Sequence, residues 1–209
     1  MANRLLKWMI TGLMAASALL TAACSLVQTS ATEGGSTRGG LIINEVVSSN
    51  RHSLIDPAAG SPDWIELYNA SDSAINLAGY GLSDNVRKLY KYTFPDVTIE
   101  AGEYLIVYAA ENNGVTKTDV PCTGFGLSKN GDSLYLCDGF FEIVQEITVP
   151  ALLTDASYAR RDNGTYGYCA SPTPGAANTT EILDSLDSLY AETGDGALYI
   201  TEVQPDGNG

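Results

Sequence analysis

The sequence of 209 residues contains few side chains that could carry out catalysis. His52 is the only histidine, and it stands in a segment rich in serine and asparagine. A serine hydrolase needs a nucleophile, a base and an orienting acid, and the Gly-x-Ser-x-Gly turn that presents the nucleophile in many hydrolases is absent here. The sequence therefore predicts no catalysis by His52.

Glu45 and Glu66 are two further acids to weigh, because each lies in a segment predicted to be a β-strand. Paired carboxylates can hydrolyse glycosides, but they need a cleft, and a sandwich of short strands does not provide one by itself. We therefore interpret both glutamates as outward-facing structural acids that hold loop amides, and we expect the chain not to be an enzyme.

Three aspartates could bind a hard cation. Asp56, Asp63 and Asp84 stand in loops or at strand ends and offer the oxygen ligands that Ca²⁺ takes. No loop has the EF-hand spacing, and zinc is disfavoured because the chain has one histidine and no Cys-x-x-Cys. We expect no cofactor, with calcium at these aspartates as the alternative.

A run of alternating aromatic residues offers a different kind of site. Tyr90, Tyr92 and Phe94 are predicted to share one face of a strand. Such a face is more often core than surface, and otherwise it could stack on sugars or on a protein partner.

Cysteine usage leaves two alternatives open. After export, Cys122, Cys137 and Cys169 remain, so at most one disulfide can form within the chain. A hairpin centred on Asn130 and Gly131 would bring the strands of Cys122 and Cys137 together, which favours that pair. A reduced, buried set of thiols is the other alternative.

Residues 1–23 are typical of a signal peptide, with a basic start and an uncharged apolar run. The small residues before Cys24 resemble a lipobox, which implies lipid attachment to Cys24 and a bacterial lipoprotein anchored outside the cytoplasm. Ordinary cleavage after Ala23, and secretion, is the alternative. Residues 24–40 are rich in glycine, serine and threonine and are predicted to be a flexible tether.

Charge excludes one class of partner. Loss of residues 1–23 removes two basic residues and no acid, so the mature chain has 9 basic and 25 acidic residues and a net charge of −16. Nucleic acid binding needs a stripe of lysine or arginine. We therefore expect no nucleic acid partner.

Most of the remaining chain alternates between short apolar runs and turns, which is typical of an all-β sandwich. The predicted strands span residues 41–47, 63–69, 75–82, 88–94, 97–99, 103–109, 124–128, 133–137, 140–149, 157–161 and 166–170. Of these, 103–109 is apolar on both faces and should be central. In 63–69, Ile65 and Leu67 should face the core. Turns at Asn130-Gly131 and at Asp138-Gly139 should join the strands between 124 and 149 into two hairpins. About nine short strands should form a sandwich over residues 41–178.

The chain changes character after this predicted sandwich. Residues 179–197 are expected to be a linker with a short amphipathic helix over 180–190. Residues 198–209 repeat the start of the first strand, with Ile200-Thr201-Glu202-Val203 matching Ile43-Asn44-Glu45-Val46. This repeat predicts the first strand of an incomplete second module.

Five motifs in a fixed order carry a family resemblance. They are Ile43-Asn44-Glu45-Val46, Trp64-Ile65-Glu66-Leu67-Tyr68-Asn69, Leu77-x-Gly79-Tyr80-x-Leu82-Ser83-Asp84, Ile99-x-Ala101-Gly102-x-Tyr104-Leu105 and Ser171-Pro172-Thr173-Pro174-Gly175. Together they resemble the lamin tail domain family, which implies an immunoglobulin-like β-sandwich that binds or scaffolds. The arrangement also resembles the N-terminal part of bacterial proteins that continue into a spore-coat-protein-H-like kinase, although none of the kinase motifs is present.

Taken together, these features predict a membrane-tethered, non-catalytic binding or scaffolding module at the cell surface. Its expected partners are the membrane, through the N-terminal lipid, and a protein or a cell-wall glycan. The alternatives are the truncated front of a larger extracytoplasmic enzyme of the kinase type above, and a carbohydrate-binding module.

Overall fold

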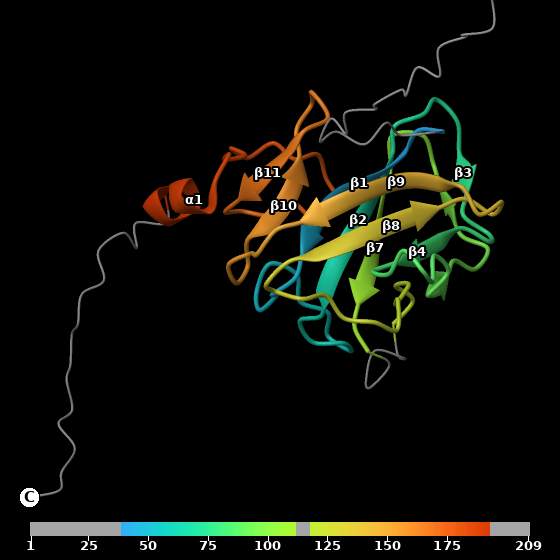
Figure 1. Cartoon of the computed structure of the whole chain (residues 1–209), viewed down its shortest axis with the longest axis horizontal. Coiled ribbons are helices and arrows are strands. Elements are labelled where there is room, and N and C mark those ends of the chain that lie inside the picture. Colours follow the sequence, from blue (N-terminus) through green and yellow to red (C-terminus); the bar gives the residue numbers. More distant parts are fainter. Residues whose placement is uncertain (1–38, 112–117, 193–209) are drawn as a thin grey trace, which may run out of the picture. The chain divides into compact units, whose positions relative to one another are not determined.

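Eleven strands and one helix form in the described residues, 39–111 and 118–192, of this computed structural model (Figure 1). They are β1 (Leu41–Val47), β2 (Asp63–Asn69), β3 (Ile75–Asn76), β4 (Gly81–Ser83), β5 (Tyr92–Thr93), β6 (Thr98–Ile99), β7 (Tyr104–Ala109), β8 (Asp132–Cys137), β9 (Ile143–Val149), β10 (Ser157–Arg160), β11 (Tyr166–Cys169) and α1 (Leu186–Glu192). The predicted signal peptide, Cys24 and the repeated strand over 198–209 lie outside the described residues. No helix in the described part is long and apolar enough to cross a membrane.

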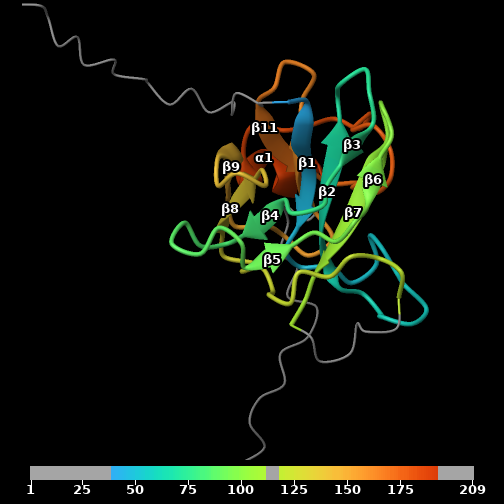
Figure 2. The same cartoon turned by 90° about the vertical axis from the view of Figure 1, so that its right-hand side faces the viewer.

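The strands form two main sheets. One has the order β11-β10-β1-β2-β7 and the other β5-β4-β8-β9, with every neighbouring pair antiparallel, while β3 and β6 pair separately. Figures 1 and 2 show β4, β8 and β9 in one layer and β1, β2 and β7 in the other. The predicted all-β, immunoglobulin-like sandwich is confirmed.

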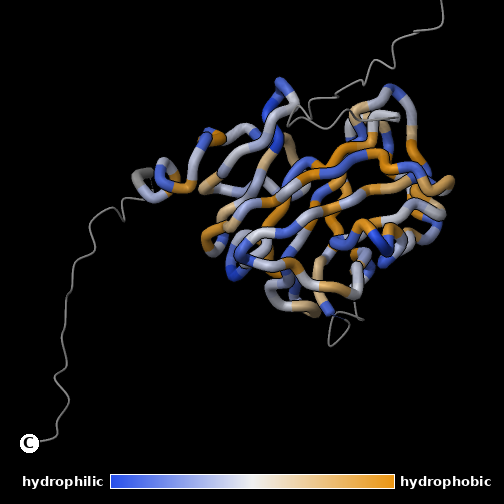
Figure 3. Tube along the Cα trace, in the orientation of Figure 1, coloured by the Kyte–Doolittle hydropathy of each residue, from blue (hydrophilic) through white to orange (hydrophobic). Residues whose placement is uncertain are grey.

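The hydrophobic core fills the space between these two layers. In β2, Ile65 and Leu67 are fully buried in this core, whereas Trp64 belongs to a second cluster on the other face. The core also takes apolar residues from β1, β4, β7, β8 and β9. Figure 3 shows hydrophobic residues concentrated along these strands and hydrophilic residues in many of the connecting loops. The alternation of side chains along β2 therefore places Ile65 and Leu67 on the core face and Trp64 on the opposite face, as the sequence predicts.

A β-bulge interrupts β1 in the middle of its sheet. Ile43 pairs with Leu67, but the next paired residue is Glu45, opposite Glu66. Asn44 is therefore the extra residue, and the bulge shifts the alternation of the strand between Ile43 and Val46, which both pack in the core.

The prediction that residues 103–109 form a central strand is wrong, because β7 is the edge of its sheet. Its two apolar faces have a different cause. Val107 packs in the main core, while Tyr108 packs with Trp64 and Val47 in the second cluster, beside Leu54 from the loop between β1 and β2. The loop between β1 and β2 therefore covers the face of β7 that points away from the main core. This cover explains why an edge strand is apolar on both faces.

Turn chemistry predicted one hairpin correctly and one wrongly. Strands β8 and β9 form the hairpin expected at Asp138 and Gly139. Residues 124–128 form no strand, and the turn that includes Gly131 leads directly into β8. The predicted strand over 75–82 is divided between β3 and β4, with Gly79 between them at a φ of 83°.

The C-terminal described segment docks on the edge of the first sheet. Leu183 exchanges two backbone hydrogen bonds with Tyr168 of β11, at 2.7 and 2.9 Å. The helix therefore begins later than expected, after Ser185, whose Oγ accepts the Ser188 amide at 3.1 Å as an N-cap. Leu189 of α1 is fully buried.

Candidate functional site

The most unusual polar group in the described residues is a pair of buried acids, Glu45 on β1 and Glu66 on β2. They are directly opposite each other in the strand register, and both are 0% exposed. Burial raises the pKa of Glu45, despite hydrogen bonds from Ser157 and Thr173 that lower it. Burial also raises the pKa of Glu66 to about 7, and the neighbouring charge of Glu45 adds to this effect.

Residues 171–178, which we call the closing segment, cover this pair. The Thr173 amide donates to Oε2 of Glu45 at 3.0 Å, and the Gly175 amide donates to Oε2 of Glu66 at 2.5 Å. Asn178 donates to the backbone oxygens of Asn44 and Arg160 at 3.2 and 2.9 Å. The segment is therefore fastened to both strands of the acid pair and to β10.

The shape of the closing segment follows from its sequence. Ala176 donates its amide to the Thr173 carbonyl at 3.1 Å, which closes a four-residue turn with Pro174 and Gly175 at its centre. Gly175 has a φ of 78°, which glycine adopts at little cost in the third position of such a turn. This conformation presents the Gly175 amide to Glu66. The interpretation of both glutamates as acids that hold loop amides is confirmed, although they are buried rather than outward-facing.

His52 takes part in a second structural network, around Asp155. Oδ1 of Asp155 accepts the amides of Arg51 and His52 at 2.6 and 2.7 Å, and that of Ser53 at 3.2 Å. Nδ1 of His52 lies 3.0 Å from Oδ2 of Asp155. Burial alone would raise the pKa of Asp155, but these hydrogen bonds outweigh it and lower the pKa to about 2. Asp155 thus fixes the loop after β1 and leaves His52 on an exposed side.

Asp155→Asn tests the charge in this network. Asparagine tolerates the φ of 62° that Asp155 adopts, so the change removes mainly the charge. We expect the free energy of unfolding at pH 7 to fall by about 1 kcal/mol, a modest loss because the side chain is 27% exposed. A lowered pKa gives stability that is present above the unfolded value near 3.8 and lost as pH falls through about 2. Urea titrations should therefore separate the two proteins at pH 7 and bring them together at pH 2; an equal difference at both would contradict this assignment.

The three aspartates proposed as calcium ligands do not come together. Asp56 accepts the amides of Ala58 and Ala59 and the hydroxyl of Tyr108. Asp63 accepts the Asn50 amide at 2.8 Å. Within residues 39–111 and 118–192, no three His, Cys, Asp or Glu side chains gather as a metal site would require. These carboxylates instead hold nearby loops.

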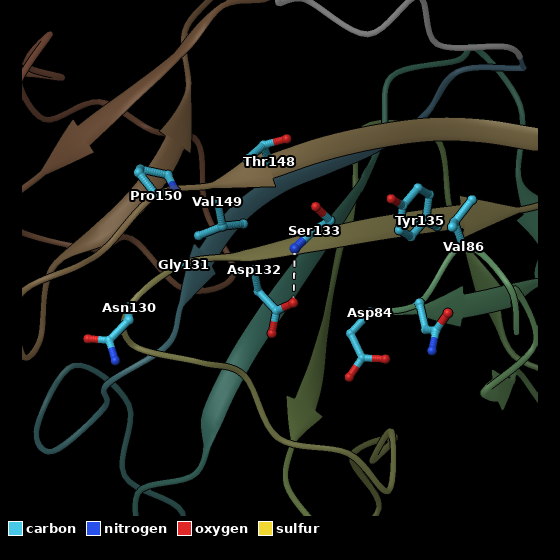
Figure 4. A pocket seen from close by; sticks show the side chains of 11 residues that line it. Asp84, Val86, Asn130, Gly131, Asp132, Ser133, Tyr135, Thr148, Val149 and Pro150 are labelled. Atoms are coloured by element: carbon cyan, nitrogen blue, oxygen red, sulfur yellow. Dashed lines mark hydrogen bonds between the residues drawn. The ribbon is translucent and has the colours of Figure 1, made fainter.

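Asp84 lies in a shallow, open depression of about 600 Å³ beside the second sheet (Figure 4). The depression is lined by residues 84–86, 130–133, 135 and 148–150. Both of its carboxylates are already engaged, Asp84 with Nζ of Lys91 at 2.6 Å and Asp132 with the Ser133 amide at 2.9 Å. The surface therefore lacks the convergent polar groups of a small-molecule site.

The structure contains free thiols at Cys122, Cys137 and Cys169 rather than the Cys122–Cys137 bond considered above. The reason is the missing first hairpin. Cys122 forms an isolated backbone β-bridge with Tyr108 at the edge of the first sheet, whereas Cys137 is the last residue of β8 in the second sheet. Burial raises the pKa of Cys137 to about 11, so this thiol stays protonated at neutral pH.

The predicted aromatic face divides into core and surface. Phe94 is buried in the core, with Tyr92 packed against that core and its ring 4.9 Å from the ring of Phe94. Tyr90 lies outside β5, where its ring is 4.7 Å from that of Phe141. Only Tyr90 of the three takes part in a surface feature.

That surface feature is the aromatic tip, the two phenylalanines at the turn between β8 and β9. Phe140 is 85% exposed and Phe141 is 75% exposed. Phe141 has a φ of 67°, a strained conformation for a bulky residue. The Tyr90 hydroxyl secures it by accepting the Phe141 amide at 2.9 Å and donating to the Asp138 carbonyl. Both phenylalanines lie in the turn rather than in the strand predicted over 140–149, and their position directly after Asp138 and Gly139 is typical of a turn.

Comparison with known proteins gave one family. A family model described as Lamin Tail Domain matches residues 35–150, which is more than half of the chain. No curated protein matched the chain. The match ends just after β9, although β10 pairs with β1 in the same sheet and the closing segment covers Glu45 and Glu66.

Proposed function

The chain belongs to the lamin tail domain family, and from this premise we propose that it is a binding or scaffolding module without catalytic activity, held outside the cytoplasm by its N-terminus. The matched region is an immunoglobulin-like module of a non-enzymatic kind. Glu45 and Glu66, the acids with the most perturbed surroundings, are closed off from solvent by residues 171–178. They are therefore used to hold the fold.

The observation that carries the binding proposal is the aromatic tip. Two adjacent phenylalanine side chains with most of their surface in water are unusual, because hydrophobic side chains normally gain free energy from burial. The strained backbone of Phe141 adds to this cost. The hydroxyl of Tyr90 holds that backbone conformation by accepting the Phe141 amide. Strain that surrounding residues preserve is characteristic of binding sites. We assign the tip as the contact surface for a protein or a cell-wall glycan.

The tethering proposal rests on the sequence. Lipid attachment at Cys24, followed by a flexible segment to residue 40, would hold the sandwich near a membrane and leave the tip free to reach a partner. The net charge of −16 after removal of residues 1–23 disfavours nucleic acid.

Replacing both phenylalanines tests this assignment. The double change Phe140→Ser and Phe141→Ser should reduce retention of the chain on a protein-containing envelope fraction at least tenfold. Burial of one phenylalanine side chain is worth about 1.5–3 kcal/mol, and 1.4 kcal/mol is a tenfold change in affinity. Retention is measured by co-sedimentation, in parallel with protein-free glycan from the same cells. Loss on the protein-containing fraction alone identifies a protein partner, and loss on both identifies the glycan.

Ile55→Ser is the matched control. Ile55 is also apolar and 62% exposed, but it lies in the loop between β1 and β2. This variant should be retained like the natural chain. Equal retention of the tip variant and the natural chain on both fractions would exclude the aromatic tip as the contact surface.

A further inference from the structure

The buried acid pair has more negative charge than its surroundings can balance. Glu45 and Glu66 are opposite each other on neighbouring strands, and like charges in this arrangement repel. Among residues 39–111 and 118–192, no ion pair includes either carboxylate. The closing segment, residues 171–178, contains no charged residue. Two ionised carboxylates with no cation beside them cannot both remain charged at little cost.

The groups that face the pair from the other elements add no charge. From β7, the titratable neighbour of Glu66 is Tyr104, and burial raises the pKa of this phenol, so it stays neutral. From β10, the neighbour is the hydroxyl of Ser157. The charge of Arg160 on the same strand acts on Tyr166. A shared proton is the remaining way to reduce the repulsion.

The hydrogen-bond partners indicate which carboxyl holds that proton. Both oxygens of Glu66 face nitrogen donors, Nδ2 of Asn44 at 2.8 Å and the Gly175 amide at 2.5 Å. Neither donor can become an acceptor while the Asn44 amide keeps this orientation. Glu66 is therefore best matched as a carboxylate.

Glu45 has a different environment. Its Oε1 lies 2.5 Å from the Ser157 hydroxyl, and its Oε2 lies 3.5 Å from the Thr173 hydroxyl as well as 3.0 Å from the Thr173 amide. A hydroxyl can accept a hydrogen bond as readily as it donates one. A proton on Oε1 of Glu45 can therefore be donated to Ser157 without leaving any partner unmatched at that oxygen.

We propose that Glu45 and Glu66 share one proton, held on Glu45 and donated to Ser157, and that loss of this proton releases the closing segment from the sheet. The two carboxylates then reach water only if the cover moves. Residues 171–178 are the part of the cover outside the strands, and they are fastened mainly through the amides of Thr173 and Gly175 and the side chain of Asn178. The segment leads to Leu183 and α1, so its release alters how the following part of the chain leaves the sandwich.

The sign of the pH effect follows from the raised pKa of the pair. The folded chain binds a proton that the unfolded chain releases above about 4.5, so this stabilisation is full below that pH. This stabilisation is lost as pH rises through about 7, the raised pKa of Glu66. Because the two carboxyls interact strongly, this pKa describes the pair as a unit and not one residue alone. The closing segment should be closed in mildly acidic solution and loosened in alkaline solution.

Amide hydrogen exchange at Gly175 tests the proposal, measured on the full chain as a protection factor between pH 6 and pH 8.5. In the natural protein the factor should fall by up to tenfold per pH unit as the pH approaches the pKa of about 7, and it should level off at a low value above that pH. In Glu45→Gln the side-chain NH₂ group takes the place of the protonated oxygen and donates to Ser157. Protection should therefore be high and independent of pH. In Glu66→Gln an NH₂ group must face Asn44 or Gly175, so protection should be low at every pH.

Three results would overturn the proposal: protection in the natural protein that does not change with pH, the same pH dependence in Glu45→Gln as in the natural protein, or the opposite behaviour of the two glutamine variants. A direct measurement avoids any dependence on how the variants fold. Carboxyl carbon NMR of the natural protein at pH 6 should show Glu45 protonated and Glu66 ionised. Two ionised carboxyls, or a proton on Glu66, would also contradict it.

Discussion

Replacing Trp64 with alanine should lower the free energy of unfolding by about 3–5 kcal/mol, the range for a large aromatic side chain removed from a packed site. Trp64 is 0% exposed, although it lies on the face of β2 opposite the main core. Val47 and Tyr108 are its cross-strand neighbours on the two sides, and its indole donates to Ser53 at 3.3 Å. The variant loses both the packing of the second cluster and an anchor for the loop between β1 and β2. Urea unfolding followed by circular dichroism measures the loss.

Val86→Ala provides the control for this measurement. Val86 is 54% exposed, so its truncation should change the free energy of unfolding by no more than about 0.5 kcal/mol. Trp64→Phe should fall between the two, because a smaller ring refills part of the site. A loss below about 1 kcal/mol in Trp64→Ala would mean that the loop does not form a packed cluster with β2.

Local pattern predicted the parts of the fold that local physics determines. Residues 41–47 and 63–69 have the bounds of β1 and β2, because strong apolar runs ended by polar turns leave few other conformations. The turn at Asp138 and Gly139 was recognised for the same reason. Ile65 and Leu67 were placed correctly in the core, because a period of two assigns faces once the strand is known.

The site depends on contacts that no local pattern contains. The Gly175 amide meets Glu66 across 109 positions of sequence, and Ser157 meets Glu45 across 112. The bulge at Asn44 places two polar side chains in succession on one face, which alternation cannot anticipate. Sequence reasoning therefore identified both glutamates as structural and could not see that they are adjacent and buried.

The aromatic tip escaped prediction for a related reason. Phe140 and Phe141 belong to residue types that favour strands, and the run from 140 to 149 alternates well enough to be assigned entirely to one strand. Their exposure depends on the left-handed conformation of Phe141 and on the Tyr90 hydroxyl, 51 positions away. The three aspartates considered as alternative ligands of one ion have separate partners: Asp56 accepts an amide of its own turn, Asp63 accepts the Asn50 amide, and Asp84 pairs with Lys91.

The second large effect is expected at Gln145, which joins the two sheets. Oε1 of Gln145 on β9 accepts the Ile43 amide of β1 at 2.6 Å, and Nε2 donates to the Tyr166 hydroxyl at 2.8 Å. The Tyr166 hydroxyl donates in turn to the Ile43 carbonyl. Gln145→Leu keeps the volume but leaves the buried Ile43 amide without a partner. The free energy of unfolding should fall by about 2–3 kcal/mol, since each buried polar group left unpaired costs about 1–3 kcal/mol.

A double-mutant cycle with Tyr166→Phe distinguishes this network from a simple loss of packing. Tyr166→Phe alone should cost about 1–3 kcal/mol, because it leaves Nε2 of Gln145 and the Ile43 carbonyl unpaired. The double variant should lose less than the sum of the single variants, because neither remaining side chain then has an unpaired polar group toward the other. Strict additivity in urea unfolding would mean that Gln145 and Tyr166 act independently rather than as one network.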